Sequence, residues 1–172
     1  MNQKDLEILF GKGYCLKKKK NLTQPGEFAS QEVLDIEKGG RTIKRVRVVG
    51  PLRSKSQVEL SATDCFILGI KPLIRDSGDI AGAPQVILIG PKGMLKISAI
   101  VARRHIHISK KEARVRNLKH GQIVSVKVTG ARAVVFDNIK IRAAENYKFC
   151  LHLDTDEGNA ASIFIKGKGE IL

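Results

Sequence analysis

The fold class is decided by the stretch EVLDIEKGGRTIKRVRVV, residues Glu32–Val49 of this 172-residue chain. Its two halves, Glu32–Ile36 and Thr42–Val49, are rich in β-branched side chains, and the pair Gly39-Gly40 lies between them. Two such runs around a Gly-Gly pair are typical of a tight β-hairpin, since glycine adopts the positive φ angles of hairpin turns. We therefore predict two paired antiparallel strands here.

Short strand-like runs continue along the chain beyond this hairpin. Further strands are predicted at 56–60, 85–89, 95–103, 123–128, 133–136, 139–141, 147–153 and 163–165. Those between residues 123 and 153 form a predicted β-meander, and 163–165 is the strand expected to close its sheet. Pro25-Gly26 and the segment Gly90–Gly93 are predicted turns. Many short, closely spaced strands are typical of β-barrels rather than of a parallel α/β sheet. The sequence contains no dinucleotide fingerprint, P-loop or nucleophile elbow.

The helical signals are few and short. A helix is predicted over residues 4–10, where Gly11 ends it. A turn or short helix is expected around residues 61–65. Ser109 and Glu112 have the spacing of a capping box at the start of another helix. Residues 154–162 are predicted to form a capped short helix.

Two related lobes would explain a faint internal echo, in which Val49-Gly50-Pro51 and Ile89-Gly90-Pro91 each follow a predicted strand. The segment Asp76–Pro84, rich in Gly and Asp, is the predicted connection. We predict a mainly β fold of two β-barrel lobes capped by short α-helices, with residues 1–80 in the first lobe and 81–172 in the second.

Positive charge dominates the composition, with a net charge of +14. Nucleic acid and phosphorylated small molecules are the two partner classes that this charge suggests. The basic residues are dispersed rather than gathered in one stripe, and the chain has no Trp and only two Tyr to stack on bases. The densest cluster, Lys17–Lys20, is predicted to be a solvated loop. We therefore favour small phosphorylated ligands over nucleic acid.

Neither the cysteines nor the apolar runs indicate an extracellular or membrane protein. Cys15, Cys65 and Cys150 are an odd number at wide spacing, so we expect small buried side chains rather than disulfides or nucleophiles. No apolar run is long enough to span a membrane, and residues 1–5 lack a secretory signal's apolar core. The expected location is the cytoplasm, with no membrane partner.

The motif Arg104-His105-Ile106-His107 indicates a metal site. Side chains two residues apart on a strand point to the same face, so His105 and His107 can reach one ion. His152 lies in a similar run, and three histidines with an open position are typical of catalytic zinc. Chance pairing is the alternative, and imidazole also suits other transition metals. The fourth histidine, His120, is predicted to be a surface turn residue.

Several segments together carry a resemblance to a known family. They are Leu22–Ala29, Arg47–Arg53, Gln57–Asp64, Arg75–Asp79, Gly90–Gly93, Arg104–His107, Val135–Asn138 and His152–Ala161. In this order, over nearly the whole chain, the sequence resembles the PduL-type phosphate acyltransferases, or phosphate propanoyltransferases. The resemblance implies two β-barrels with two zinc ions between them, and transfer of an acyl group between coenzyme A and inorganic phosphate.

The resemblance also implies roles for particular residues. His105, His107 and His152 match the ligands of one zinc, and Glu59 matches a carboxylate ligand of the other. Arg53 matches the catalytic, phosphate-binding arginine. Lys20, Arg47 and Asn159 match positions near coenzyme A. The alternatives are a solvated strand carboxylate for Glu59, a surface arginine for Arg53, and an ordinary member of the lysine run for Lys20.

One departure from the family affects the second zinc site. Family members begin with a strand that carries its own Arg-His-x-His motif, and Met1–Leu6 of this chain aligns with the helix that follows that strand. Without that strand, Glu59 is the only expected protein ligand of the second zinc, and a barrel edge is left unpaired.

The leading hypothesis is a zinc-dependent enzyme that interconverts acyl-CoA plus phosphate with acyl phosphate plus coenzyme A, for propanoyl or acetyl groups. Direct attack by phosphate is expected, because no protein nucleophile is evident. The first alternative is a truncated, weakly active or inactive relative that binds coenzyme A or a partner, and the second is a basic nucleic-acid-binding barrel. The resemblance adds a bacterial microcompartment as a second location and a homo-oligomer as a possible assembly.

Overall fold

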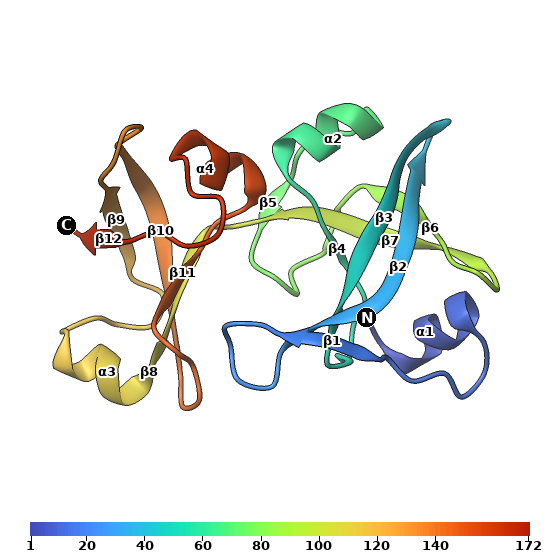
Figure 1. The fold of residues 1–172 in the computed structure, drawn as a ribbon, viewed down its shortest axis with the longest axis horizontal. Helices are drawn as coiled ribbons and strands as arrows, with labels where there is room; N and C mark the ends of the chain where they lie inside the picture. The colour runs from blue at the N-terminus through green and yellow to red at the C-terminus, as the bar shows by residue number, and fades with distance from the viewer. The chain divides into compact units, whose positions relative to one another are not determined.

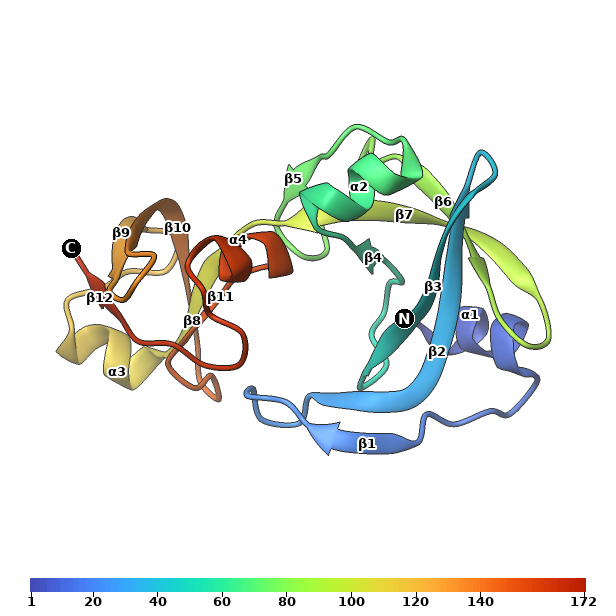
Figure 2. The same ribbon diagram turned by 45° about the horizontal axis from the view of Figure 1, so that its top comes forward.

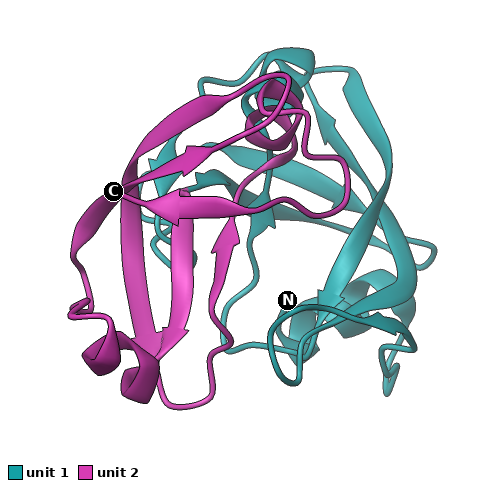
Figure 3. Ribbon diagram, turned by 60° about the vertical axis from the view of Figure 1, so that its left-hand side comes forward, with its two compact units in different colours: residues 1–102 teal, residues 103–172 magenta.

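The computed structural model describes all of residues 1–172 and confirms a mainly β fold with short helices (Figure 1). The chain forms two compact units, Met1–Ala102 and Arg103–Leu172 (Figure 3). This division differs from the predicted boundary at residue 80. The reason is that the strands between Gln85 and Ala102 join the sheet of the first unit, so the segment Asp76–Pro84 is a loop within that unit.

The first unit contains one sheet of seven strands, in the order β1-β2-β6-β7-β4, with β3 paired to β2 and β5 paired to β7. Figure 2 shows this sheet curving as a half-barrel. Its strands are β1 Lys18–Asn21, β2 Phe28–Lys38, β3 Arg41–Gly50, β4 Val58–Glu59, β5 Ile74–Arg75, β6 Gln85–Ile89 and β7 Met94–Ala102.

The predicted hairpin is confirmed as β2 and β3, which are paired antiparallel around Gly39-Gly40. Both glycines have positive φ, at 57° and 79°. Alternate residues of β2, including Leu34 and Ile36, are buried in the core, as a half-buried strand requires. Lys18–Lys20 of the lysine run lie in the edge strand β1 instead of the predicted loop. Its side chains are nonetheless exposed, and charged residues of this kind discourage pairing of an edge with other chains.

Two helices pack on this unit. The helix α1, Gln3–Phe10, begins at Asn2, whose side chain accepts a hydrogen bond from the backbone of Asp5, and it buries Leu6 and Leu9. The turn between β6 and β7 lies directly against its end: a Cβ added to Gly90 would lie 2.5 Å from the carbonyl oxygen of Leu9. The close approach of two backbones therefore requires a glycine in this turn.

The second helix, α2, covers Ala62–Leu68. It is held at its start by a capping box between Ser61 and Asp64. Cys65, on the inner face of this helix, is buried in the core as predicted, whereas Cys15 is exposed and Cys150 is only half-buried, so burial was wrongly predicted for Cys15.

The second unit contains a five-stranded sheet in the order β11-β8-β10-β9-β12. Its strands are β8 His105–Ser109, β9 Ile123–Val128, β10 Val134–Ala144, β11 Cys150–His152 and β12 Gly169–Ile171, and its helices are α3 Lys110–Val115 and α4 Thr155–Ala160. None of the four helices in the chain is long and apolar enough to cross a membrane.

This sheet differs from the predicted meander in three respects. First, β8, which precedes the predicted meander, joins the sheet by pairing parallel to β10. Second, the runs predicted at 133–136 and 139–141 form the single strand β10, with a bulge at Asn138, whose φ is 58°. Third, β12 closes the sheet, while Phe164 and Ile165 in the expected closing strand are 81% and 91% exposed.

The two faces of this sheet have different chemistry. Ile106, Ile108, Ile139 and Ile141 on β8 and β10 are buried in the core of the unit. Because strand side chains alternate between faces, the residues between them, His105 and His107 among others, lie on the opposite face.

Candidate metal centre

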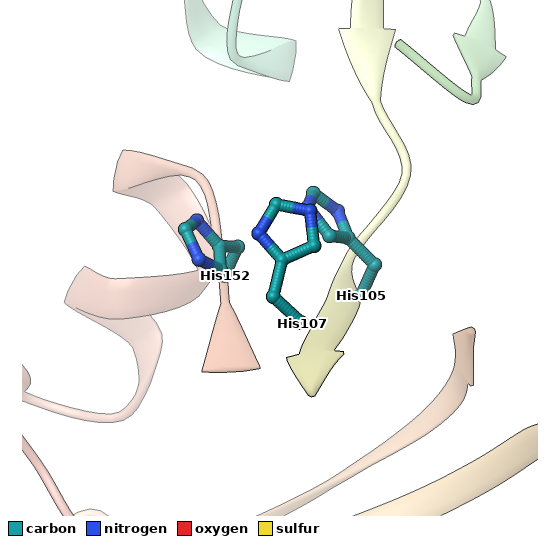
Figure 4. Close-up of side chains that lie close together, drawn as sticks. All are labelled: His105, His107 and His152. Atoms are coloured by element: carbon teal, nitrogen blue, oxygen red, sulfur yellow. The ribbon is translucent and has the colours of Figure 1, made fainter. Parts of the chain in front are cut away.

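Three histidines meet on the face of the sheet opposite the core (Figure 4). His105 and His107 are two residues apart on β8, and His152 lies directly opposite His105 on the antiparallel strand β11. One ring nitrogen from each residue lies within 4.8 Å of the others. His105 and His152, 47 positions apart in the sequence, are thus brought into reach of one ion by a single strand pairing.

The three rings lie close to one another. His105 and His152 are stacked, with centroids 5.0 Å apart and planes 6° apart. The ring centroid of His107 is 4.6 Å from each of the other two, and its plane is tilted by 58° to both. Figure 4 shows the three imidazoles facing one another from the two strands.

A backbone contact defines the tautomer of His105. Its Nδ1 lies 2.8 Å from the carbonyl oxygen of Arg103, which can only accept, so the proton belongs on Nδ1. The other nitrogen, Nε2, is then the one with a lone pair for a metal. Such a hydrogen bond to the second nitrogen is the usual way in which a ligating imidazole is oriented.

Tyr147, a residue that the sequence analysis did not single out, packs on the cluster. Its ring centroid lies 4.0 Å from that of His107, at an interplanar angle of 25°. His107 is only 7% exposed. The only available signal was that Tyr147 is one of two tyrosines, five residues before His152.

The donor set fits a transition-metal ion. Three imidazoles leave a fourth tetrahedral position for water or substrate, which is the ligand count of catalytic rather than structural zinc. The chemistry of imidazole also accommodates cobalt, nickel, copper and iron, so the three histidines could hold a metal ion without selecting one element. The chain contains no other group of three or more metal-ligating side chains so close together.

The neighbouring helix α4 is held beside the motif by charge. Arg104 forms an ion pair of 3.3 Å with Glu157, and its guanidinium lies 5.5 Å from the ring centroid of Phe136. Burial raises the pKa of Glu157, which also takes part in the capping box with Asp154. Asn159, predicted to lie near coenzyme A, is exposed on this helix.

Arg53 and Glu59, both in the first unit, are connected by a short chain of hydrogen bonds. Gln57 Nε2 donates to Glu59 Oε1 at 2.6 Å and to Ser77 Oγ at 2.8 Å, and Arg53 Nη1 lies 3.5 Å from the same Ser77 oxygen. Arg53 Nη2 also forms an ion pair of 2.8 Å with Glu27. Arg53 is thus a partly exposed arginine with a carboxylate partner.

The remaining predicted residues lie outside these clusters. Lys20 is exposed on β1. Arg47 on β3 donates from Nη1 to the carbonyl oxygen of Ser30 at 2.7 Å. His120 lies in a turn, as predicted, and its Nδ1 accepts a hydrogen bond from the backbone of Ala143.

Comparison with known proteins identifies close relatives along almost the whole chain. A sequence model described as phosphate propanoyltransferase matches residues 1–164. A phosphate propanoyltransferase of Thermotoga maritima is 45% identical over 166 residues, which cover 95% of this chain and 79% of the relative. A phosphate propanoyltransferase of Lachnoclostridium phytofermentans is 46% identical, over 95% of this chain and 78% of the relative. One of Listeria monocytogenes is 38% identical, over 100% of this chain and 82% of the relative.

Proposed function

The chain belongs to the phosphate propanoyltransferase family, and we propose that it interconverts acyl-CoA plus inorganic phosphate with acyl phosphate plus coenzyme A, with propanoyl or acetyl as the acyl group. The observation that carries this proposal is the cluster of His105, His107 and His152, whose ring nitrogens lie within 4.8 Å of one another. Three ligands with one open position suit a reaction in which an oxygen must be polarised.

The reaction exchanges one bond at the acyl carbon for another. A phosphate oxygen forms a bond to the carbonyl carbon, the carbon–sulfur bond breaks, and the electron pair leaves with the sulfur of coenzyme A. Phosphate, acyl phosphate and the phosphate-bearing coenzyme A are all anions. The net charge of +14 favours their approach to the protein. A zinc ion bound to the three histidines would supply positive charge for the oxygen that becomes negative during the transfer.

The residues of the chain are assigned complementary tasks. The guanidinium of Arg53 is proposed to hold phosphate, since its fork of N–H donors matches two phosphate oxygens. Lys20, Arg47 and Asn159 are proposed to contact coenzyme A. No activated serine or cysteine is needed, because phosphate itself is the nucleophile. Glu59 remains a predicted ligand of a second zinc. A single carboxylate does not form a metal site, so we assign no step to it.

The test is a phosphate-dependent assay of the zinc-loaded protein. We expect release of coenzyme A from propanoyl-CoA, and formation of an acyl phosphate, only when phosphate is present. His152→Ala should abolish turnover, whereas the matched control His120→Ala should retain it. Zinc-loaded, folded protein that shows no phosphate-dependent release would contradict the proposal.

The family relationship is also the basis for the proposed location, which is the bacterial cytoplasm or a microcompartment within it. Fractionation of cells that express the tagged protein, followed by immunoblotting of soluble and microcompartment fractions, tests this assignment.

A further inference from the structure

The face that carries the histidines also carries two cations on the neighbouring strand. In the parallel pairing of β10 with β8, Lys140 lies opposite His105, and Arg142 lies opposite His107. Ile141 of β10 is fully buried in the core. Because strand side chains alternate, Lys140 and Arg142 on either side of Ile141 share the face of the histidines.

Three strands thus form two rows of side chains across this face. The first row is Lys140, His105 and His152, and the second is Arg142, His107 and Cys150. Neighbouring strands lie about 4.8 Å apart, so Lys140 and Arg142 each occupy a strand position adjacent to a histidine of the cluster. The row positions follow from backbone pairing and are independent of side-chain rotamers.

Arg142 is half-buried, and the ion pairs within the second unit do not involve it. Glu157 pairs with Arg104, Glu145 pairs with Lys110, and Glu112 pairs with Arg116. These three carboxylates are therefore engaged by other cations, and Arg142, whose strand position is next to that of His107, forms none of these ion pairs.

A divalent ion at the three histidines would make this arrangement strongly positive. Like charges at close range are unfavourable unless an anion lies between them, and a half-buried guanidinium gains most from an anion that accepts two parallel hydrogen bonds. A phosphate group has the charge and the oxygen geometry that satisfy both conditions.

We infer that Arg142, assisted by Lys140, binds a phosphate group on the histidine face of the second unit. This inference rests on the proposed function for its choice of ligand, which is either inorganic phosphate or a phosphate of coenzyme A. Arg142 is then a binding residue distinct from Arg53, which belongs to the first unit.

The test measures binding rather than turnover. Inorganic phosphate and coenzyme A are titrated separately into zinc-loaded wild-type, Arg142→Gln, Arg142→Lys and Lys140→Gln proteins by calorimetry. The matched control is Arg132→Gln, which removes the same charge from an exposed turn of the same unit. Bound zinc is quantified by mass spectrometry in every sample.

We expect Arg142→Gln to weaken one of the two ligands by about 10-fold or more, the usual loss for a hydrogen-bonded charge pair, with zinc content unchanged. The ligand whose affinity falls, inorganic phosphate or coenzyme A, identifies the source of the phosphate group that Arg142 binds. Arg142→Lys should lose less, and it carries the test if the glutamine variant does not fold. Arg132→Gln should bind both ligands as the wild type does.

Unchanged affinity for both ligands in zinc-loaded Arg142→Gln would overturn the inference while leaving the proposed function intact, provided that the wild type turns over. Wild-type protein that binds phosphate through Arg142 and yet shows no turnover would instead overturn the proposed function alone.

Discussion

Tyr147 stacks on His107, with the two ring centroids 4.0 Å apart and the ring planes 25° from parallel. His107 is the most buried of the three histidines, so its orientation depends on the residues packed against it. We therefore predict a positioning role for Tyr147, which stacks on a predicted metal ligand without being part of the histidine cluster.

Removal of this ring should loosen the metal site. An aromatic pair contributes about 0.5–1.5 kcal/mol beyond its buried area, so Tyr147→Ala should weaken zinc binding by about 2- to 10-fold. Tyr147→Phe keeps the stacked ring and should bind zinc as the wild type does. Competition with a chromogenic chelator measures both affinities. Equal affinities for the alanine variant and the wild type would contradict the positioning role.

Metal removal should lower the stability of the second unit. An ion that binds only the folded state adds about 2.7 kcal/mol at a hundredfold excess over its dissociation constant. We therefore expect a chelator to lower the melting temperature of the wild-type protein, and zinc to restore it. His107→Ala should melt at one temperature with or without zinc. His120→Ala, which changes a histidine outside the cluster, should keep the zinc-dependent shift.

The ion pair between Arg53 and Glu27 should compete with phosphate. Their 2.8 Å contact must be broken or shared when Arg53 takes a phosphate oxygen. Partly exposed pairs of this kind are worth about 1 kcal/mol or less, so Glu27→Gln should lower the KM for phosphate by up to about 5-fold. Arg53→Gln should raise that KM and lower kcat/KM. Steady-state kinetics at varied phosphate separates the two effects, and a higher phosphate KM in Glu27→Gln would refute the competition.

A buried carboxylate in the first unit predicts a pH-dependent stability. Burial alone would raise the pKa of Glu32, but hydrogen bonds outweigh it and hold the pKa below the ordinary glutamate value. One of these bonds is donated by the hydroxyl of Tyr14 at 2.9 Å and another by the backbone of Lys17 at 3.2 Å. A carboxylate whose pKa is lowered on folding stabilises the protein above its ordinary pKa, and this stabilisation is lost as the pH falls through the lowered value.

Tyr14→Phe should therefore lower the free energy of unfolding by about 1 kcal/mol at neutral pH, because it removes one donor to this carboxylate. The difference from the wild type should shrink as the pH falls through the range in which Glu32 takes up a proton. Urea denaturation at a series of pH values measures it. Tyr147→Phe is the matched control and should show no such dependence. A difference that grows in acid would show that Glu32 is not the partner that matters.

Local patterns accounted for much of the fold. The hairpin of β2 and β3 follows from Gly39-Gly40, since two adjacent glycines at positive φ define a tight turn whatever the remainder of the chain does. The starts of α2 and α4 follow from the capping residues Ser61 and Asp154, which satisfy backbone donors only a few residues away. The i, i+2 spacing of His105 and His107 on one strand face is equally local.

Pairing between distant segments was decided only in the tertiary structure. A strand's alternation shows which residues share a face but not which strand lies beside it, because any partner can complete its hydrogen bonds. The parallel pairing of β8 with β10, the position of Arg142 beside His107, and the stack of Tyr147 on that ring all depend on such pairing. The unit boundary after Ala102 has the same origin, since β6 and β7 complete the sheet that β2 begins.

The sequence by itself thus determined the mainly β class, the hairpin, the helix starts and the three candidate metal ligands. The tertiary structure decided which side chains surround those ligands, because register and packing are set by the whole core of Ile106, Ile139 and Ile141 rather than by any short segment.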